Sequence, residues 1–332
     1  MELFKGRAGV LYAEALEGGI YEGLAKVVAE KRVEEAAEYG AEQVASVSAP
    51  RSAAEVRRRP GKLVEVKPNL KVADNPNVMH FKDRKGVTWA YSIQGGEALL
   101  RGVFANNNVA QGDLSGEVRV PVTLGNCPVL AIPNQAFNKC EAMTHIVLPP
   151  GLKSIGVHAF QHTKALEEIV VPESVEVIGG GAFSGSGIRK IQLPANIVRC
   201  CVGSTFCNCK RLEAIDLPDG IEHIGVFEFV GSTSLRKVHF PKSLKSMHDW
   251  TFHNCDLEEV VLPFGVERVG HHAFSDNKNL KFLKIESENI RIDGDGNYRV
   301  VFDLPPGVPV HVTKRWKGPT GTLHGHAVKC VK

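Results

Sequence analysis

The apolar positions of this chain recur at a nearly constant interval over about half of its length. Phenylalanine occurs seven times in step, with five intervals of 23 residues and a last interval of 22. These are Phe137, Phe160, Phe183, Phe206, Phe229, Phe252 and Phe274. A fixed period of about 20–50 residues is typical of proteins built by stacking one structural unit on the next. We therefore expect stacked coils rather than a single globule.

Each repeat also contains a triplet in which two apolar residues flank a third residue, as in Ile169-Val170-Val171. Such alternation predicts a short strand with one buried face. A proline follows six of the seven triplets and should end the strand, because proline lacks the N–H donor that the next ladder bond needs. Glycine follows the apolar residue that precedes four of the phenylalanines, and we expect it to permit a turn that a β-carbon would prevent. Those glycines are Gly156, Gly179, Gly225 and Gly270.

The segments LPPGLKSIGVHAFQHTKALEEIVVP, SVEVIGGGAF and GIEHIGVFEF resemble the BspA-type leucine-rich repeat over about residues 118–286. With the period, the resemblance predicts an α/β leucine-rich-repeat solenoid. We expect it to be strand-dominated, a short right-handed stack of about seven repeats of 22–24 residues with an N-terminal helix and an extended arm. The resemblance implies binding rather than catalysis. Repeat four departs from the pattern at Cys201-Val202 and repeat six at Met247-His248, so we expect their convex turns to differ.

The first 75 residues lie outside the repeats. Residues 10–44 have apolar side chains at helical spacing, which predicts a helix that docks through the face formed by Leu16, Ile20, Leu24 and Val27. Residues 51–71 contain seven Lys or Arg against two Glu, whereas residues 10–44 contain eight Glu against three Lys or Arg. The basic arm includes Arg51, Arg57, Arg58, Arg59 and Lys62. It is either a solvated linker or an extended arm that lies on an acidic partner. RNA binding is disfavoured because no aromatic residues interleave with the basic ones.

Four regions follow from these patterns. They are the helix and basic arm at 1–75, an N-terminal cap hairpin at 76–130, the solenoid at 131–286, and a C-terminal cap and tail at 287–332. Caps are expected because the end of a solenoid otherwise exposes its core.

Composition excludes few functions. The 332 residues carry a net charge of only +3, which gives no reason to expect nucleic acid. No apolar run is long enough to span a membrane and the first residues lack the pattern of a signal peptide, so we expect an intracellular protein. A surface location stays open if a leader was removed from a longer precursor.

The eight cysteines suggest structure rather than a metal centre. Cys140, Cys209 and Cys255 share one small-residue column inside the repeat, and Cys201 replaces a core isoleucine. Cys200 and Cys207 occupy columns that are polar elsewhere, so we expect them nearer the surface. The spacing in CCVGSTFCNC matches no usual zinc ligand set. The stretch DGDGNY, from Asp293, imitates the start of a calcium loop but lacks its central glycine.

No phosphate-binding loop, nucleophile motif or paired catalytic carboxylates are present, so we expect no enzyme activity, no cofactor, no metal and no small-molecule ligand. The partners should be other protein chains. In each strand triplet the middle residue points outward, and so does the residue before the triplet. This predicts a partner-binding sheet face formed by His145, Val147, Glu168, Val170, Lys190, Gln192, Asp216, Lys237, His239, Glu259, Val261, Phe282 and Lys284.

Two classes of function remain open at this point. The first is a protein–protein interaction scaffold, a structural subunit docked in a multiprotein complex through its helix, its arm and the sheet face. The second is a stand-alone binding module or a cell-surface adhesin that recognises a protein or a glycan. Order of the first 75 residues only against other chains would favour the subunit.

Overall fold

The computed structural model describes residues 78–105, 108–288, 290–292, 304–315, 317, 322–323 and 326–331. The chain divides into two units, and everything below concerns the one formed by Asn69–Lys332. The predicted helix at 10–44 and the basic arm at 51–71 lie outside the described residues.

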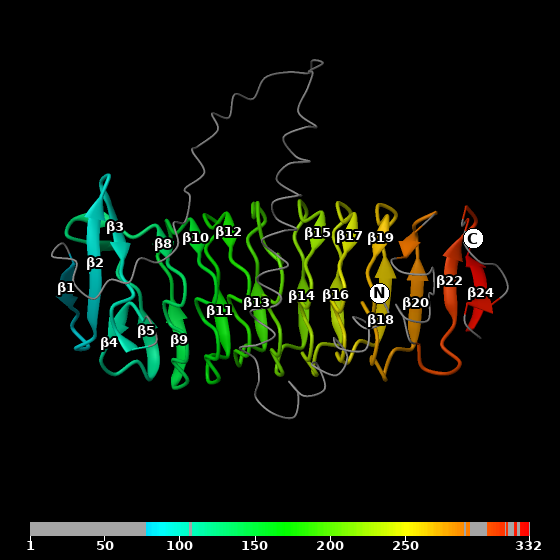
Figure 1. Ribbon diagram of the computed structural model, residues 1–332, viewed down its shortest axis with the longest axis horizontal. Coiled ribbons are helices and arrows are strands. Elements are labelled where there is room, and N and C mark those ends of the chain that lie inside the picture. The colour runs from blue at the N-terminus through cyan, green and yellow to red at the C-terminus, as the bar shows by residue number, and fades with distance from the viewer. Residues whose placement is uncertain are drawn as a thin grey trace, which may run out of the picture. The chain divides into compact units, whose positions relative to one another are not determined.

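Short parallel strands follow one another along the stack (Figure 1). A first sheet has the order β13-β11-β9-β5, the pair β14-β16 continues the row, and β18-β20-β22-β24 completes it. Their bounds are β5 Gly116–Arg119, β9 Met143–Val147, β11 Glu168–Val170, β13 Lys190–Gln192, β14 Ala214–Asp216, β16 Lys237–His239, β18 Glu259–Leu262, β20 Phe282–Ile285, β22 Val310–Thr313 and β24 His326–Val331. The predicted strand-dominated solenoid is confirmed, with about eight turns and no helix among the described residues.

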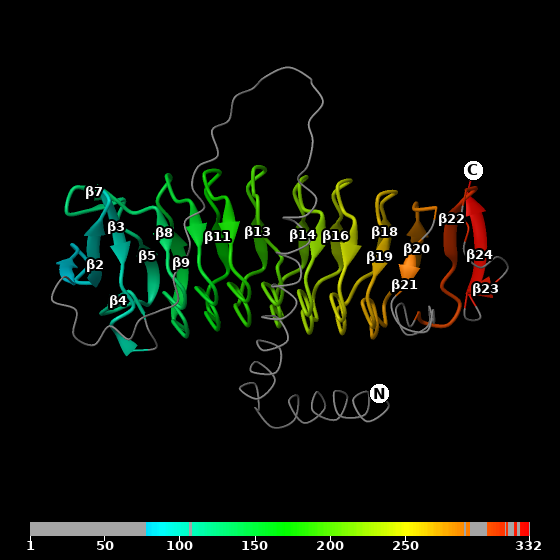
Figure 2. The ribbon, with the colours of Figure 1, turned by 45° about the horizontal axis from the view of Figure 1, so that its top comes forward.

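A second series of very short strands runs beside the first, with one strand in most coils (Figures 1 and 2). It forms two sheets, β12-β10-β8 and β15-β17-β19-β21. Their bounds are β8 Ala131–Ile132, β10 Ser154–Ile155, β12 Val177–Ile178, β15 His223–Ile224, β17 Ser246–Met247, β19 Arg268–Val269 and β21 Arg291–Ile292. The coil that carries Phe206, called coil four below, contributes only an isolated bridge between Val177 and Arg199. The expected irregularity of repeat four is thus confirmed, whereas repeat six keeps its strand at Met247.

Antiparallel strands precede the stack. β1 (Met79–Lys82), β2 (Thr88–Gln94), β3 (Glu97–Leu100) and β4 (Ala110–Gln111) form one sheet, and β6 (Thr123–Leu124) pairs with β7 (Cys127–Pro128). Trp89 of β2 is fully buried and packs edge-on against Phe137 of the first coil, with ring centroids 6.2 Å apart. This sheet therefore covers the apolar end of the stack.

Parallel pairing continues beyond the expected end of the repeats. β22 pairs with β20, and β24 pairs with β22. β23 (Thr322–Leu323) then pairs antiparallel with β24. The stack is therefore longer than the seven repeats counted from phenylalanine, and the boundaries at 76, 131 and 287 remain predictions.

The seven recurring phenylalanines form a single ladder inside the stack. All seven are fully buried. Successive rings are nearly parallel, tilted by 3–9°, with centroids 4.9–5.7 Å apart. This offset stacking is a favoured arrangement of aromatic rings. Because each ring contacts the next, a coil that is too small to bury its own core shares one with its neighbours.

The glycine that recurs between repeats has a different cause from the one expected. Gly156 does not adopt a left-handed φ; instead, a β-carbon there would lie 2.5 Å from the backbone nitrogen of Asn134 in the preceding coil. Gly225 and Gly270 meet the same obstacle. Glycine at this column therefore permits close approach of two coils rather than a special turn. Left-handed residues recur two before and two after each phenylalanine, as at His158 and His162.

Candidate functional site

The outward face of the long strands is the most extended surface that the repeats build. In β11, β13, β14 and β16 the middle residue is buried and both its neighbours are exposed. The ladder pairing sets these exposed residues side by side in two columns, so that Glu168 lies between His145 and Lys190. Of the thirteen residues predicted for this face, eleven are exposed, whereas Phe282 and Lys284 are half-buried. We call these thirteen residues the sheet face.

The centre of the sheet face carries charge of both signs. Asp216 and His239 lie opposite each other in β14 and β16, and the Nδ1 atom of His239 contacts a carboxylate oxygen of Asp216. Their side chains are 82% and 60% exposed, so this pair is accessible to a partner. Lys237 lies beside Ala214 in the other column.

Ion pairs run along one border of the sheet face. Arg189 contacts Glu213 at 3.0 Å, and Arg211 contacts Glu167 at 2.7 Å. The hydrogen bond from each arginine holds the pKa of its glutamate below the ordinary value. These side chains are well solvated, and surface pairs of this kind contribute little to stability. Their consequence is a charged border in which Arg189 connects adjacent coils and Arg211 reaches past one coil to Glu167.

Valines make the part of the sheet face nearest the N-terminal strands apolar. Val170 is 73% exposed and lies next to Val147 of the preceding coil, which is 39% exposed. Val261 is likewise 39% exposed on a later coil. Single exposed valines are ordinary on a sheet and do not by themselves indicate a binding site. They matter here because they lie on the same face as the charged centre.

Sequence reasoning missed the two ends of this surface. Glu117 and Arg119 of β5 lie in register with His145 and Val147, and they extend both columns by one strand. At the other end, His311 and Lys329 continue the column of Lys284. These strands lack the recurring phenylalanine, so the period did not reveal them. The alternating stretch Val118-Arg119-Val120 was the signal that could have revealed the first of them.

The two other predicted sites lie outside the described residues. They are the helix docking face, Leu16, Ile20, Leu24 and Val27, and the basic arm, Arg51, Arg57, Arg58, Arg59 and Lys62.

Coil four contains a second cluster that sequence reasoning placed only in part. Cys201 and the inner-column cysteines Cys140, Cys209 and Cys255 are buried, as expected. Cys200 and Cys207 are also buried, each only 6% exposed, so the expectation that they lie near the surface was wrong.

An extra residue explains the error. After Phe183 the core residue Ile188 and the strand arrive one position early, and one residue is added before Phe206. The added residue forms a bulge in which Cys201 has a left-handed φ of 57° and Gly203 a φ of 132°. Both Cys200 and Cys201 then turn inward, and the short strand of this coil is lost.

Glu228 lies beside this bulge in the next coil. It is fully buried, in the column just before phenylalanine that holds Ala159 and Ala182 elsewhere. Burial raises the pKa of its carboxyl to about 7, whereas nearby Thr205, the Gly203 backbone and the Cys201 thiol act in the opposite direction. Neither carboxyl oxygen has a partner that meets full hydrogen-bond geometry.

Within the described part of the chain, no group of three or more His, Cys, Asp and Glu side chains is arranged to hold a metal ion. No helix in that part has the length and apolar character needed to cross a membrane.

The fold and its exposed strand face define a leucine-rich-repeat solenoid. The family model for the BspA type leucine rich repeat region, in 6 copies, matches residues 130–203 and 201–296. The chain belongs to this family. Repeat domains of this class are in general modules that bind proteins or surfaces, and the family is one of non-enzymatic repeat proteins.

Solved structures share this fold. A leucine rich cell surface protein from Faecalibacterium prausnitzii A2-165 is 18% identical, with a TM-score of 0.52, over 73% of this chain and 72% of that one. The Leucine Rich Repeat protein of T. pallidum is 24% identical, with a TM-score of 0.49, over 58% of this chain and 87% of that one. A leucine-rich repeat protein from Bacteroides ovatus ATCC 8483 is 18% identical, with a TM-score of 0.40, over 78% and 76%. No curated protein matches the chain.

Proposed function

We propose that this chain is a non-catalytic scaffold that binds other protein chains through the sheet face. The observation that carries the proposal is the sheet face itself, in which exposed side chains stand in two columns across neighbouring parallel strands. The repeating core of the stack holds the strands in register, so the backbone that carries the contact side chains needs little ordering when a partner binds. A pre-ordered surface binds at a lower entropic cost than a surface that must be ordered.

The partner that fits best is a polypeptide strand or loop of mixed charge. Asp216 and His239 supply adjacent acceptor and donor groups near the middle of the surface, and Lys237 supplies a positive charge one column away. Val170 and Val147 supply apolar contact toward one side. A polar centre of this kind favours specificity and orientation, whereas the apolar residues contribute burial on contact.

We further propose that the protein is a structural subunit of a larger assembly. The sequence of its first 75 residues supports this, because the apolar face at Leu16, Ile20, Leu24 and Val27 needs a partner and the basic arm suits an acidic surface. An intracellular site is supported by the seven cysteines whose side chains the structure describes, because none of them is in a disulfide.

A cell-surface adhesin is the second candidate. It is favoured by one observation, the name of the Faecalibacterium prausnitzii protein that shares the fold. In that case the sheet face would bind a protein or glycan outside the cell, and the first 75 residues would have no part in binding.

Co-purification from the native source with a matched pair of charge exchanges tests the scaffold proposal. Asp216→Arg with Lys237→Glu reverses two exposed charges on the sheet face and should abolish recovery of the partners that the unaltered chain retains. Glu222→Arg with Lys245→Glu makes the same exchange on the turns beside the short strands, where both residues are exposed, and should leave recovery unchanged. Thermal unfolding of both variants confirms that folding survives.

Equal recovery with both double variants would overturn the sheet face as the interface. A third variant, Arg57, Arg58 and Arg59→Glu, separates the subunit from the adhesin. If this variant recovers fewer partners than the unaltered chain, and the difference is larger at low ionic strength, the subunit is supported. The reason is that salt screens exposed charges, beyond about 10 Å at 0.1 M, so a contribution of the arm's charges should be largest at low salt. Unchanged recovery with this variant, together with loss by the sheet-face variant, supports the adhesin.

A further inference from the structure

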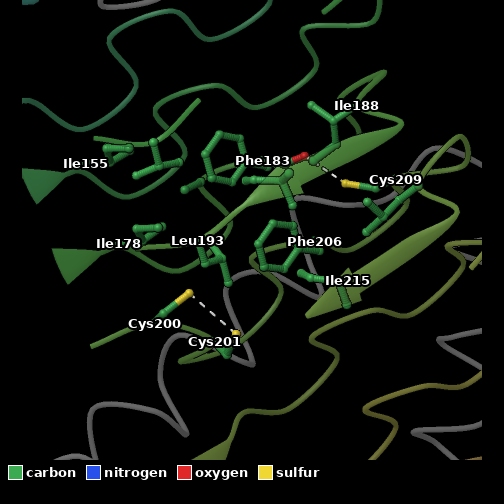
Figure 3. Packing of buried hydrophobic residues seen from close by; sticks show 14 of the residues in the cluster. Ile155, Ile178, Phe183, Ile188, Leu193, Cys200, Cys201, Phe206, Cys209 and Ile215 are labelled. Carbon is green, nitrogen blue, oxygen red and sulfur yellow. Dashed lines mark hydrogen bonds between the residues drawn. The ribbon is translucent and has the colours of Figure 1, made fainter. Parts of the chain in front are cut away.

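The bulge of coil four brings two adjacent thiols together inside the core. The Sγ atoms of Cys200 and Cys201 lie 3.5 Å apart and share a hydrogen bond. Figure 3 shows the pair at the position where neighbouring coils present the single side chains of Ile155 and Ile178. Both thiols are free and buried, at 6% and 0% exposure. Two soft, oxidisable atoms therefore replace one apolar side chain.

Glu228 adds a buried carboxyl group to the cluster, and packing alone does not explain its presence. Its column holds alanine in four of the other six coils that carry a phenylalanine and threonine in two, and burial of a carboxyl without full hydrogen bonding costs free energy. The Cys201 thiol is one of the groups that contact this carboxyl. A buried carboxylate beside a thiol is an arrangement that can accept the proton of that thiol.

We propose that Cys200 and Cys201 form a redox-sensitive dithiol, which hydrogen peroxide converts to a reversible disulfide with Glu228 as the proton acceptor. The pair is reduced at rest, as its free thiols indicate. Hydrogen peroxide is small enough to enter a core that excludes larger oxidants such as glutathione disulfide.

The chemistry balances in two steps. Glu228 accepts the proton of Cys201, and the thiolate attacks one oxygen of the peroxide. The O–O bond breaks, the sulfur is oxidised to a sulfenic acid, and the departing hydroxide takes the proton from Glu228 and leaves as water. The sulfur of Cys200 then attacks the sulfenic sulfur. The S–S bond forms, the S–O bond breaks, and the hydroxide leaves with the proton of Cys200 as a second water.

A base is needed because the thiol is otherwise inert. The hydrogen bond with Cys200, followed by burial, holds the pKa of Cys201 well above its ordinary value. The thiolate is the reactive form, and few thiolates exist at neutral pH without a proton acceptor. Cys209 provides the contrast within the same coil. Burial raises its pKa to about 12, and its Sγ donates to the carbonyl oxygen of Phe183 at 3.1 Å.

Geometry makes the bond reversible. Adjacent Cα atoms are about 3.8 Å apart across a trans peptide, whereas bridged cysteines usually have Cα atoms about 4.4–6.8 Å apart. The bridge between neighbours is therefore strained, and strained disulfides are more easily reduced. The pair would act as a sensor that is reset by a cellular dithiol rather than as a permanent crosslink.

Peptide mass spectrometry of the full-length protein tests the proposal. The folded protein is treated with hydrogen peroxide, denatured, alkylated and digested with trypsin, which cuts after Arg199 and Lys210 and releases residues 200–210. We expect this peptide to lose two hydrogens, to keep alkylated Cys207 and Cys209, and to regain four alkylated thiols after dithiothreitol. Cys127, which is half-buried in β7, reports that the peroxide reached the protein.

Two outcomes would overturn the dithiol. The first is oxidation of Cys127 while all four thiols of the peptide remain alkylated. The second is a bridge that fragment ions place at Cys207 or Cys209. Cys200→Ser should form no bridge and should carry sulfinic acid at Cys201, since no neighbouring thiol intercepts the sulfenic acid.

The role of Glu228 is tested separately by the rate. Glu228→Ala introduces the residue that four other coils have at this column and should slow bridge formation at least about tenfold. Glu222→Ala removes an exposed glutamate from the same coil and should leave the rate unchanged. An unchanged rate in Glu228→Ala, with the bridge still formed, would remove Glu228 from the proposal and leave the dithiol in place.

Discussion

Coil two, which carries Phe160, and coil four belong to the same stack but pack against their neighbours in different ways. Coil two has Ile155, Gly156 and Ala159 in the columns before Phe160, and its short strand pairs with both neighbours. Coil four has one residue more on this side, two cysteines in place of one isoleucine, and no short strand. Nevertheless the ring of Phe206 lies 5.7 Å from that of Phe183 and 5.3 Å from that of Phe229, as regular as elsewhere.

The comparison shows which feature of a coil must be preserved and which can vary in length. Coil four keeps the 23-residue step because the residue lost after Phe183 is regained before Phe206. After Phe252 one residue is also lost, at Leu257, and it is not regained, so the step to Phe274 is 22. Both coils keep the ladder. The stack therefore tolerates a change of length in the turns, provided that each phenylalanine still reaches the ring before it.

The irregular coil differs in what it buries. Coil two buries Ile155 and Ala159 just before its phenylalanine, whereas coils four and five bury Cys200, Cys201, Thr205 and Glu228 there. Stability and its dependence on pH should therefore differ between the two regions.

The largest effect should come from the ladder itself. Phe183→Ala removes a ring that contacts a neighbour on both sides, so the free energy of unfolding should fall by about 3–5 kcal/mol. Phe206→Ala in coil four should cost a similar amount, because its ring is stacked equally well. Denaturant unfolding measures both. A much smaller loss at Phe206 would mean that the irregular coil does not share the common ladder.

The next effect should depend on pH. The pKa of Glu228 is about 7 in the folded chain against an ordinary value of 4.5, a difference worth about 3 kcal/mol. Below pH 4.5 both states hold the proton and nothing is lost. As pH rises from 4.5 to about 7, only the unfolded state releases the proton, so the folded state loses stability relative to it. Above pH 7 the loss is complete.

Glu228→Ala should remove this dependence. The variant should become progressively more stable than the unaltered chain between pH 4.5 and 7, as followed by unfolding at several pH values. A constant difference between the two proteins over this range would show that the carboxyl is not held neutral by burial.

A smaller effect should separate two glycines of the same coil. Gly156→Ala places a β-carbon about 2.5 Å from the backbone of coil one and should cost about 1–3 kcal/mol. Gly151→Ala is the matched control, because its nearest neighbour would be a methyl group of Leu130 at 3.8 Å. The control should be neutral or slightly stabilising. Equal unfolding midpoints for the two variants would contradict close approach as the reason for glycine.

Much of this fold was predictable because the same residue pattern recurs in every repeat. Phe183 is buried for the same reason as Phe160, so seven copies of one weak pattern establish a column that a single copy would leave ambiguous. The alternation in Ile191-Gln192-Leu193 predicted an exposed Gln192 in the same way, and the structure confirms it. The sheet face as a surface therefore followed from the sequence, whereas its role as an interface remains a prediction.

The sequence by itself determined the stacking, the buried ladder and the direction of the strand side chains, because these depend on contacts between equivalent residues one period apart. Only the tertiary structure decided how the chain packs where a coil departs from the regular spacing of residues. The inward turn of Cys200 and Cys207, the proximity of Cys201 to Glu228, and the obstacle above Gly156 all depend on how one coil lies against the next. The cysteine and glutamate contacts join residues of different type at positions that do not repeat, so no column in the sequence reports them. The glycine column does repeat, but its cause is the backbone of the preceding coil, which the sequence does not place.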